Sequence, residues 1–391
     1  MLQQRIFADN HASTPIDPLV LEGMMGALRD FHGNPSSSNS CGREAMALCQ
    51  WARESIAQVL DCSPDRVLFT SGATESNNLA LKSGRDIGRA MGRDHIVTTS
   101  IEHSSVLECA RMMAADRSRP CRLTVVPVGP SGIVDPRAVA AAITRRTAIV
   151  SVMQANNELG TIQPIEECAR IAQAAGAMFH TDAAQSFGKV PIDLANVDMI
   201  TVSGHKIYGP KGVGALYIRP EIAAKMKPEI AGGSHEHGLR AGTLNAPSLY
   251  GLGIAAREMV IQWPEEAPQV GSMRDDLWRL IQDGLGRDGV RWNGTDDMSR
   301  RLPGNLNFTI IGVCPRLFQP AIDPYVTLSG AAACRGPGVS HVLAAIGAPA
   351  DDGASVRIGL GRFNTPGEIP MIADRIIAVA LELRGQACSI D

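Results

Sequence analysis

A lysine, an aspartate and a histidine each follow closely on an apolar stretch of the chain. Lys206 lies in SGHKIYGPKG after DMITV, Asp182 closes AMFHTD, and His103 comes shortly after HIVTTS. Lysine side chains are costly to desolvate, so a lysine held between apolar stretches is either a chance surface residue or an amine used in chemistry. An amine beside a carboxylate and an imidazole could form a Schiff base with a carbonyl compound and move protons around it.

Polar residues also follow two further apolar stretches. After RVLFT the chain reads SGATESNNLALK, a turn of small residues that opens into a helical pattern. The backbone N–H groups of such a helix start, together with the hydroxyls of Ser71 and Thr74, would suit a phosphate group. After TAIVSVM comes QANNELG with its two asparagines, and Gln185 follows closely on Asp182. The residues that follow these apolar stretches thus provide an anion site, an imidazole, amides, a carboxylate and an amine.

This set of groups matches what pyridoxal 5′-phosphate (PLP) requires of a protein. The aldehyde needs a lysine, and the ring nitrogen needs a carboxylate that keeps it protonated, so that the ring can act as an electron sink. The phosphate needs a helix N-terminus with hydroxyl donors. An imidazole stacked on the ring and an amide near its 3-oxygen would complete the site.

The elements that must position these groups are the strands of a parallel sheet. Apolar, β-rich stretches alternate with helical patterns such as PRAVAAAITR and IEECARIAQAAG, which predicts a mostly parallel sheet covered by helices on both faces. Ligands of such sheets bind at the carboxyl ends of the strands. Beyond about residue 250 the pattern changes to long helices around a few strands. We therefore expect an α/β fold, with a large domain over 15–250 and a smaller α+β domain made of 1–14 and 251–391.

Composition excludes several classes of function. The chain has 391 residues with 37 basic and 40 acidic side chains and a net charge of −3, so direct nucleic-acid binding is not expected. The N-terminus lacks the pattern of a signal peptide, and no window is apolar enough to span a membrane. Nine scattered cysteines, an odd number without zinc-ligand spacing, fit a reducing compartment. We expect a cytoplasmic protein.

Each candidate residue also has an ordinary interpretation. Asp182 could be the N-cap of a helix beginning in DAAQS, His103 a capping or packing residue, and Lys206 a surface lysine. The placement of all of them at strand ends favours the functional interpretation. For the cluster 235–237 (HEH) we expect solvent-facing or hydrogen-bonded side chains, and no metal site is predicted.

The motifs resemble those of the NifS/IscS-type cysteine desulfurases, within the class V aminotransferase-like, fold-type I PLP enzymes. The likeness covers nearly the whole chain, from FADNHASTP through GNPSSSNSCGREA, FTSGATESNNLA, IEHSSVLE, NNELGTIQPI, HTDAAQSFGKVPID, SGHKIYGPKGVGALY and GLRAGT to VRIGLGRFNT. It implies a PLP-dependent transferase that converts L-cysteine to L-alanine. The sulfur would remain on the enzyme as a persulfide and pass to an acceptor protein.

The resemblance assigns a role to each candidate residue. Lys206 forms the Schiff base with PLP, His103 stacks on the ring and serves in proton transfer, and Asp182 pairs with the ring nitrogen. The remaining contacts fall on Asn157 beside the cofactor and substrate, on Gln185 near the 3-oxygen, on Ala73, Thr74, Ser203 and His205 at the phosphate, and on Thr243, which reaches the phosphate of the neighbouring subunit. The last contact implies a homodimer.

By the same resemblance Cys334, in SGAAACRGPG, carries the persulfide. The glycines around it would let the loop swing a sulfur towards the cofactor and then towards an acceptor. Arg357 matches the arginine that grips the substrate carboxylate, a task for which its planar fork is suited. Its neighbour Arg362 could instead be a structural ion-pair partner.

The chain departs from the family's pattern in several places. Asn39 stands where histidine is common, and the loop after Cys334 is shorter than in the IscS type. The segment CPRLFQPAIDPYVTLSG before the cysteine is rich in proline where relatives continue a helix, and we expect its prolines to interrupt one. These departures leave the sulfur acceptor open between an iron–sulfur cluster assembly scaffold, a tRNA-modifying protein, a DNA-sulfur-modification partner and another thiol.

Two other functions are compatible with parts of the pattern. One is a class V PLP lyase or aminotransferase, including a selenocysteine lyase, in which Cys334 carries no persulfide. The other is a scaffold that has lost its chemistry, which the presence of Lys206, Asp182 and His103 argues against.

Overall fold

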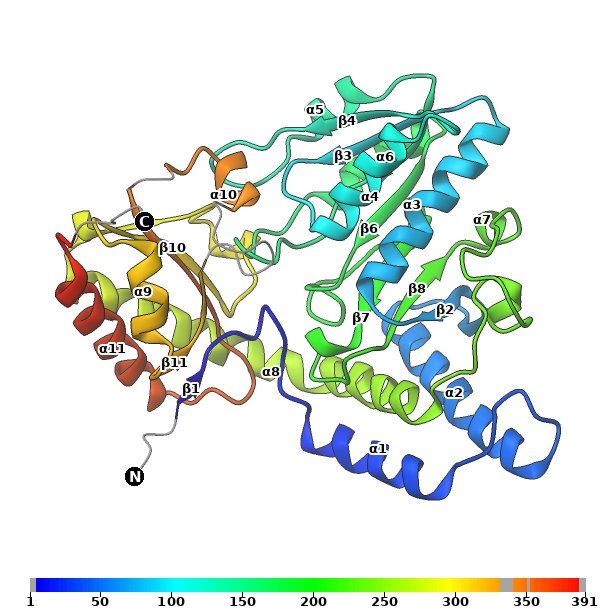
Figure 1. Cartoon of the computed structure of the whole chain (residues 1–391), viewed down its shortest axis with the longest axis horizontal. Helices are drawn as coiled ribbons and strands as arrows, with labels where there is room; N and C mark the ends of the chain where they lie inside the picture. Colours follow the sequence, from blue (N-terminus) through cyan, green and yellow to red (C-terminus); the bar gives the residue numbers. More distant parts are fainter. Residues whose placement is uncertain (1–4, 331–339, 350–351, 387–391) are drawn as a thin grey trace.

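The structure is a computed structural model in which residues 5–330, 340–349 and 352–386 are described. Two sheets of different size lie side by side, and one long helix, α8 (Ala246–Leu285), runs along both (Figure 1). Cys334 lies outside the described residues. Among the described helices, none has the length and apolar character needed to cross a membrane.

The larger sheet has seven strands in the order β2-β8-β7-β6-β5-β3-β4. All of them run parallel except β8, which pairs antiparallel with both neighbours. This confirms the mostly parallel sheet predicted from the sequence. The strands are β2 (Val67–Thr70), β3 (His95–Thr99), β4 (Arg122–Val126), β5 (Thr147–Ser151), β6 (Met178–Asp182), β7 (Met199–Ser203) and β8 (Gly214–Ile218).

Consecutive strand residues are buried on opposite faces of this sheet, as the period of two requires. Leu68 packs in one core and Phe69 in the other, and Ile149 and Val150 divide in the same way. Helices α3 (Ala73–Ala90) and α4 (Ser104–Ala115) cover the first face. The second face packs against α2 (Ser40–Val59), α5 (Pro136–Ala142), α6 (Ile165–Ala174) and the first half of α8.

Local chemistry explains where the first two helices begin. Helix α1 (Pro18–Asp30) has proline in its first turn, and the carboxylate of Asp17 accepts a hydrogen bond from Leu19 N at 2.9 Å. Helix α2 is capped by Asn39, whose side-chain oxygen accepts from Gly42 N at 2.9 Å. Asparagine and aspartate are preferred at this position because they satisfy an otherwise unpaired N–H group. The unusual asparagine at 39 therefore has a structural role.

The smaller sheet is antiparallel, in the order β12-β13-β10-β9. Helix α11 (Glu368–Leu383), helix α9 (Pro315–Ile322) and the second half of α8 pack around its core. Helix α10 (His341–Ala345) instead places Val342 and Leu343 in the core of the larger sheet. Two short strands, β1 (Ile6–Phe7) and β11 (Val326–Thr327), pair in parallel beside it. The sheet strands are β9 (Val290–Trp292), β10 (Asn305–Ile311), β12 (Ser329–Gly330) and β13 (Gly353–Gly359).

The expectation that prolines interrupt the helix before the cysteine loop is wrong for Pro320. Helix α9 (Pro315–Ile322) continues through this residue and buries Phe318 and Ile322. Pro320 removes the hydrogen bond to the carbonyl of Arg316, but both residues are exposed, so water can hydrate that carbonyl. Helix α8 likewise contains two prolines in its interior.

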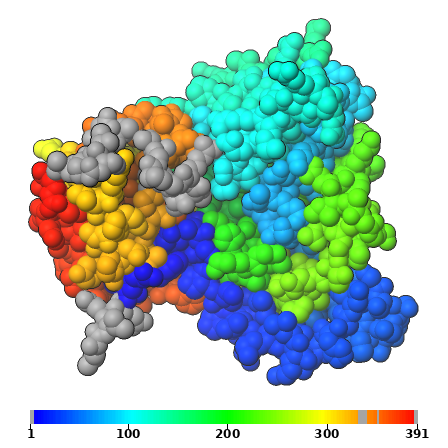
Figure 2. Space-filling model, in the orientation of Figure 1, coloured from blue at the N-terminus to red at the C-terminus, as the bar shows by residue number. Residues whose placement is uncertain are grey.

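Helix α8 and the N-terminal segment connect the two sheets. Buried residues of α8 up to Met259 belong to the core of the larger sheet, and those from Val270 belong to the core of the smaller one. Residues 8–14 pass between the two sheets, so that the blue N-terminal chain in Figure 2 lies between the yellow and green parts of the surface. The division of the chain near residue 250 stays a proposal.

Candidate active site

Four of the predicted site residues lie at the same edge of the larger sheet. Asp182 ends β6, Ser203 ends β7, and Lys206 follows in a short 3₁₀ turn (Gly204–Lys206); His103 stands between β3 and α4. Burial is the main cause that lowers the pKa of His103, with Asp182 raising it and Lys206 lowering it. His103 therefore lies within electrostatic range of both other groups.

Asp182 is a buried carboxylate with two described donors. Its Oδ2 accepts from Asn77 Nδ2 at 2.7 Å, and its Oδ1 accepts from Ala184 N at 2.9 Å. The alternative of a helix N-cap is not realised, because residues 184–189 form turns. Two N–H donors hold the carboxylate in a fixed orientation, as a partner of a protonated ring nitrogen requires.

His103 does cap a helix, as the ordinary interpretation supposed. Its Nδ1 accepts from Ser105 N at 3.2 Å and lies 2.8 Å from Ser105 Oγ. No described residue hydrogen-bonds its Nε2. Capping uses one ring nitrogen and leaves the other for a ligand, so the structural and functional interpretations are compatible.

The amine of Lys206 is held by the N-terminal segment. Nζ donates to the carbonyl oxygen of His11 at 2.6 Å and to that of Ala12 at 2.9 Å. The side-chain amide of Gln185 donates to the same His11 carbonyl at 2.9 Å, and its oxygen lies 3.1 Å from His11 Nδ1. Lys206 and Gln185 thus both contact a stretch of backbone that lies 174 to 195 positions earlier in the chain.

A second half-buried lysine, Lys189, contacts the backbone of Lys206. Lys189 Nζ donates to the carbonyl oxygen of Lys206 at 3.0 Å and lies 5.8 Å from the ring centre of Trp263. Burial, followed by the charges of Lys206 and Arg362, lowers the pKa of Lys189 to about 8.

Helix α3 begins where the phosphate was predicted to bind. Gly72 precedes it with φ 143°, and no side chain caps the helix start. A Cβ at Gly214 would lie 2.7 Å from Gly72 Cα and 2.5 Å from Val202 O, so only glycine permits this close approach of β8 to the turn. An uncapped helix start of this kind suits an anion. Ala73 and Thr74 lie in its first turn, and His205 Nδ1 lies 3.2 Å from Ser13 Oγ.

Arg357 occupies a buried position with three described partners. Its Nη2 donates to Asp9 Oδ1 and to Ser329 Oγ, both at 2.8 Å, and its Nη1 donates to the carbonyl oxygen of Asn157 at 3.1 Å. Its Nε has no hydrogen-bond partner among the described residues. A buried guanidinium with an unused N–H group is suited to a carboxylate ligand.

Arg362 is a structural residue, as the alternative interpretation proposed. It forms buried ion pairs with Asp17 and Glu266, and its guanidinium stacks over the ring of Tyr208 at 4.4 Å. Three parts of the chain are joined by this one side chain.

Two further candidates can be placed directly. Thr243 is exposed, and no described side chain hydrogen-bonds it. In the 235–237 cluster Glu236 is buried, where it accepts from Arg53 Nη2 at 2.6 Å and from Phe69 N at 2.7 Å. No group of three or more potential metal ligands was found in the part of the chain that the structure describes.

Sequence reasoning missed the residues that support the named ones. Asn77, Ser105, Lys189 and Asp9 contact Asp182, His103, Lys206 and Arg357 respectively. One signal was present for Asn77, which stands three positions after Thr74 on the same helix and so shares its face. The others depend on contacts between elements that no local pattern encodes.

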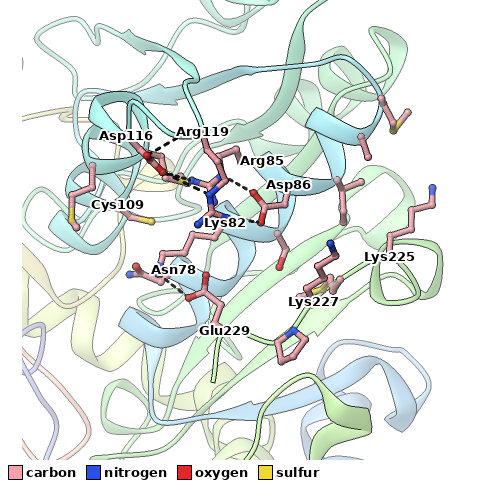
Figure 3. A pocket seen from close by; sticks show the side chains of 18 residues that line it. Asn78, Lys82, Arg85, Asp86, Cys109, Asp116, Arg119, Lys225, Lys227 and Glu229 are labelled. Carbon is pink, nitrogen blue, oxygen red and sulfur yellow. Dashed lines mark hydrogen bonds and ion pairs between the residues drawn. The ribbon is translucent and has the colours of Figure 1, made fainter. Parts of the chain in front are cut away.

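A cavity of about 870 Å³ lies elsewhere on the larger domain, lined by α3, α4 and residues 225–229 (Figure 3). Its charged side chains largely pair with one another: Lys82 bonds Glu229 at 2.8 Å, and Arg85 bonds Asp86 at 2.8 Å. None of the predicted cofactor-binding residues lines it. We assign this cavity no part in the chemistry.

The residues present fit PLP. The observations are the fixed carboxylate, the imidazole with a ring nitrogen left over, the half-buried amine and the uncapped helix start beside a turn that a Cβ would obstruct. Each group that PLP requires has one counterpart at this edge of the sheet.

Comparison with known proteins gives the family. The pattern of the family described as aminotransferase class-V matches residues 6–372, and the chain belongs to this family, whose members use PLP. It is 40% identical over 385 residues to the cysteine desulfurase IscS of Anaeromyxobacter sp. (strain Fw109-5), covering 97% of this chain and 93% of that protein.

Solved structures agree with this relationship. A NifS-like protein superimposes with a TM-score of 0.89 at 33% identity, covering 97% of this chain and 100% of the other. SspA, solved in complex with cysteine, matches with a TM-score of 0.78 at 34% identity over 92% of this chain and 100% of its own. The predicted fold class and the predicted relationship to the NifS/IscS type are confirmed.

Proposed function

We propose that this chain is a PLP-dependent cysteine desulfurase that converts L-cysteine to L-alanine and carries the sulfur as a persulfide on Cys334. The observation that carries the proposal is the meeting of Lys206, Asp182 and His103 at one edge of the sheet. The relatives named cysteine desulfurase support the choice of substrate.

PLP would be held by the groups described above. Lys206 would be the amine that binds its aldehyde, Asp182 would pair with the ring nitrogen, His103 would cover the ring, and Gln185 would serve the 3-oxygen. The helix start at Ala73 and Thr74, with Ser203 and His205, would hold the phosphate, and Asn157 would serve cofactor and substrate. When bound, PLP supplies the electron sink that stabilises negative charge at the substrate Cα.

The charges of this chain prepare the site for that chemistry. The Asp182 carboxylate would retain a proton on the ring nitrogen, because two N–H donors fix its orientation. Lys189, held against the Lys206 carbonyl, adds positive potential behind the reactive amine. A nearby cation favours the neutral form of an amine, and only the neutral form is nucleophilic.

Arg357 binds the carboxylate of L-cysteine. Its unused Nε and its Nη2, which also bonds Ser329, would offer N–H groups to two carboxylate oxygens, while the bond to Asp9 fixes the plane of the guanidinium. The hydrogen bond from Arg357 to the Asn157 carbonyl would keep the loop that contains Asn157 beside the substrate.

In the sulfur step, the sulfur atom passes from the thiol of L-cysteine to the thiol of Cys334. The Cys334 thiolate attacks the substrate sulfur, an S–S bond forms, and the bond between sulfur and Cβ breaks with its electron pair left on the substrate. Protonation of that carbon gives alanine, and the enzyme keeps one added sulfur. An acceptor thiol then takes the sulfur. The candidates for this acceptor are the four kinds named from the sequence.

A homodimer and a cytoplasmic location belong to the proposal. Leu21, Met25 and Leu28 form a stripe on α1 that is 47%, 61% and 64% exposed, and such a stripe is suited to cover by a second copy. Thr243 is exposed, as a residue serving the other subunit would be in a single chain. The scattered, odd-numbered cysteines support the reducing compartment.

The test follows the sulfur atom. The wild-type protein is incubated with L-cysteine, alanine is quantified, and each cysteine is examined for added sulfur by mass spectrometry without reductant. We expect alanine to form, with the added sulfur on Cys334. Lys206→Ala should lose the absorbance of bound PLP and form no alanine, while its circular dichroism stays unchanged.

Cys334→Ser separates the remaining candidates. A desulfurase variant without the sulfur carrier should bind PLP normally and lose almost all alanine formation. Alanine formation at the wild-type rate in that variant would instead support the class V lyase, with selenocysteine as the substrate to test next.

A further inference from the structure

Four side chains form a continuous hydrogen-bonded row from Asp182 to His103. Asn77 Nδ2 donates to Asp182 Oδ2 at 2.7 Å and to Ser105 Oγ at 2.8 Å, and Ser105 Oγ lies 2.8 Å from His103 Nδ1. Asn77 and Ser105 are fully or almost fully buried. Neither residue was a candidate in the sequence, and the mechanism above uses only Asn77, as one of the two donors to Asp182.

The direction of each hydrogen bond in this row is determined from the Asp182 end. Both oxygens of Asp182 accept from N–H donors, as an ionised carboxylate does. The Asn77 amide must therefore turn its NH₂ group towards Asp182. Its oxygen points elsewhere and has no partner among the described residues.

The second proton of the Asn77 NH₂ group then fixes the Ser105 hydroxyl. That proton is donated to Ser105 Oγ, so the hydroxyl's own proton points away from Asn77. The neighbouring acceptor is His103 Nδ1. Ser105 N donates to the same nitrogen at 3.2 Å, so Nδ1 receives two donors and must carry a lone pair.

We propose that Ser105, oriented by Asn77 and Asp182, holds His103 in the neutral tautomer with its proton on Nε2. His103 then offers an N–H donor at the one ring nitrogen that no described residue contacts. Ser105 and Asn77 are positioning residues, since they act through His103. The inference deepens the proposed function and rests on it only for the meaning of His103 in the reaction.

The tautomer restricts what His103 can do. Accepting a proton would require Nδ1, which faces a hydroxyl proton and a backbone N–H. The resting His103 is therefore a hydrogen-bond donor that stabilises negative charge, and removal of a proton from the substrate falls to another group. Lys206 is the amine within electrostatic range of His103.

The row also links His103 to its titratable neighbours. The charged or titratable groups that act on it are Asp182, Lys206 and His205. Donors to Nδ1 favour the neutral ring. Loss of the Ser105 hydroxyl removes one of these donors and so removes part of the stabilisation of the neutral ring. The pKa of His103 should therefore rise.

The experiment reads the tautomer directly. Full-length protein loaded with PLP and labelled with ¹⁵N-histidine is examined by two-bond ¹⁵N–¹H NMR, and the His103 signals are identified by their loss in His103→Gln. We expect wild-type His103 to show a protonated Nε2 and a bare Nδ1 above pH 7. Ser105→Ala should lower the ratio of this tautomer to the other by about tenfold, the equivalent of one hydrogen bond.

Two variants control the comparison. Ser104→Ala removes a neighbouring hydroxyl for which the described structure shows no hydrogen bond, and it should leave the spectrum unchanged. Ser105→Thr keeps the hydroxyl and should restore the wild-type ratio and pKa. The wild-type spectrum is decisive by itself if Ser105→Ala fails to fold.

A proton on Nδ1 in the wild type would overturn the proposal, and so would a Ser105→Ala spectrum that matches Ser104→Ala. Neither result depends on alanine formation. Failure of the proposed function would instead appear as wild-type protein with the expected tautomer and no alanine from L-cysteine.

Discussion

Glu102 is a buried acidic residue directly before His103, and no role in ligand binding is assigned to it. Its carboxyl accepts from Thr99 Oγ1 at 2.7 Å and from Met153 N at 3.0 Å, while its backbone carbonyl oxygen lies 2.9 Å from His341 Nε2. Burial raises its pKa to about 8, only partly offset by these hydrogen bonds. Glu102 thus joins the turn before α4 to the end of β5 and to α10.

Glu102→Gln should change how stability depends on pH. The folded pKa lies above the unfolded value of 4.5, so the folded wild type holds an extra proton between about pH 4.5 and 8. The wild type therefore loses stability as pH rises through this window, by at most about 1.4 kcal/mol per unit. The glutamine variant lacks this loss.

Urea unfolding at several pH values measures the effect. The free energy of unfolding of Glu102→Gln minus that of the wild type should increase steadily from pH 5 to 8. A difference that stays constant with pH would mean that Glu102 is already ionised in the folded protein.

At this scale the sequence predicted the residues that carry unusual chemistry and not those that orient them. Lys206, Asp182 and His103 each follow an apolar stretch, so strand ends reveal them. Ser105 looks like any residue in the first turn of a helix. Its role depends on how α3 and α4 are rotated against each other, which hydrophobic period alone does not determine.

Among the elements, strand β8 has the greatest effect on the site. Its first residue, Gly214, lies against the turn that starts α3, because β8 runs opposite to its neighbours and brings its amino end to the ligand edge. Residues 214–218 (GALYI) have the apolar pattern of a strand, but the pattern does not give the direction of that strand. That direction depends on the short connection from Lys206, which leaves no room for a crossover helix.

Gly214→Ala should weaken PLP binding. The added Cβ would meet backbone atoms of Val202 and Gly72 at 2.5 and 2.7 Å, and overpacking of this kind costs about 1–3 kcal/mol. If the displacement falls on Gly72, the helix start moves and the dissociation constant of PLP should rise by about tenfold.

Titration of the cofactor-free variant with PLP, followed by absorbance, gives that constant. Gly129→Ala is the matched control, since a Cβ there meets nothing within 4 Å. Equal affinities in the two variants, with both folded by circular dichroism, would remove the start of α3 from the phosphate site.

Other elements show where sequence patterns mislead. The prolines before the cysteine loop predicted a break, yet α9 continues through Pro320, because tertiary packing on one face outweighs a lost hydrogen bond on the other. The crossing of residues 8–14 between the sheets had no local signal. It depends on contacts with residues more than 300 positions away.

At the scale of the whole molecule, the proposed dimer predicts that two inactive variants regain activity when their chains are combined in one dimer. If Thr243 serves the neighbouring site, a mixed dimer of Lys206→Ala and Thr243→Ala chains contains one complete site, with Lys206 from one chain and Thr243 from the other. Each homodimer has none. The purified mixed dimer, carrying two different tags, should form alanine at about half the wild-type rate, since one of two sites is intact.

If Thr243 instead acts within its own chain, the mixed dimer contains no complete site and recovers nothing. The wild type tagged in the same two ways is the control, because it shows whether the tags themselves change the rate.

The crossing of the N-terminal segment through the site also determines when the site can exist. Ile6 pairs with Val326, and Asp9 bonds Arg357, which stands 348 positions later. Lys206 is held by the backbone of His11 and Ala12, so its surroundings remain incomplete while the ribosome is still making the last strand. The first residues to leave the ribosome are among the last to find their place, and PLP should bind firmly only to chains whose synthesis has passed residue 359.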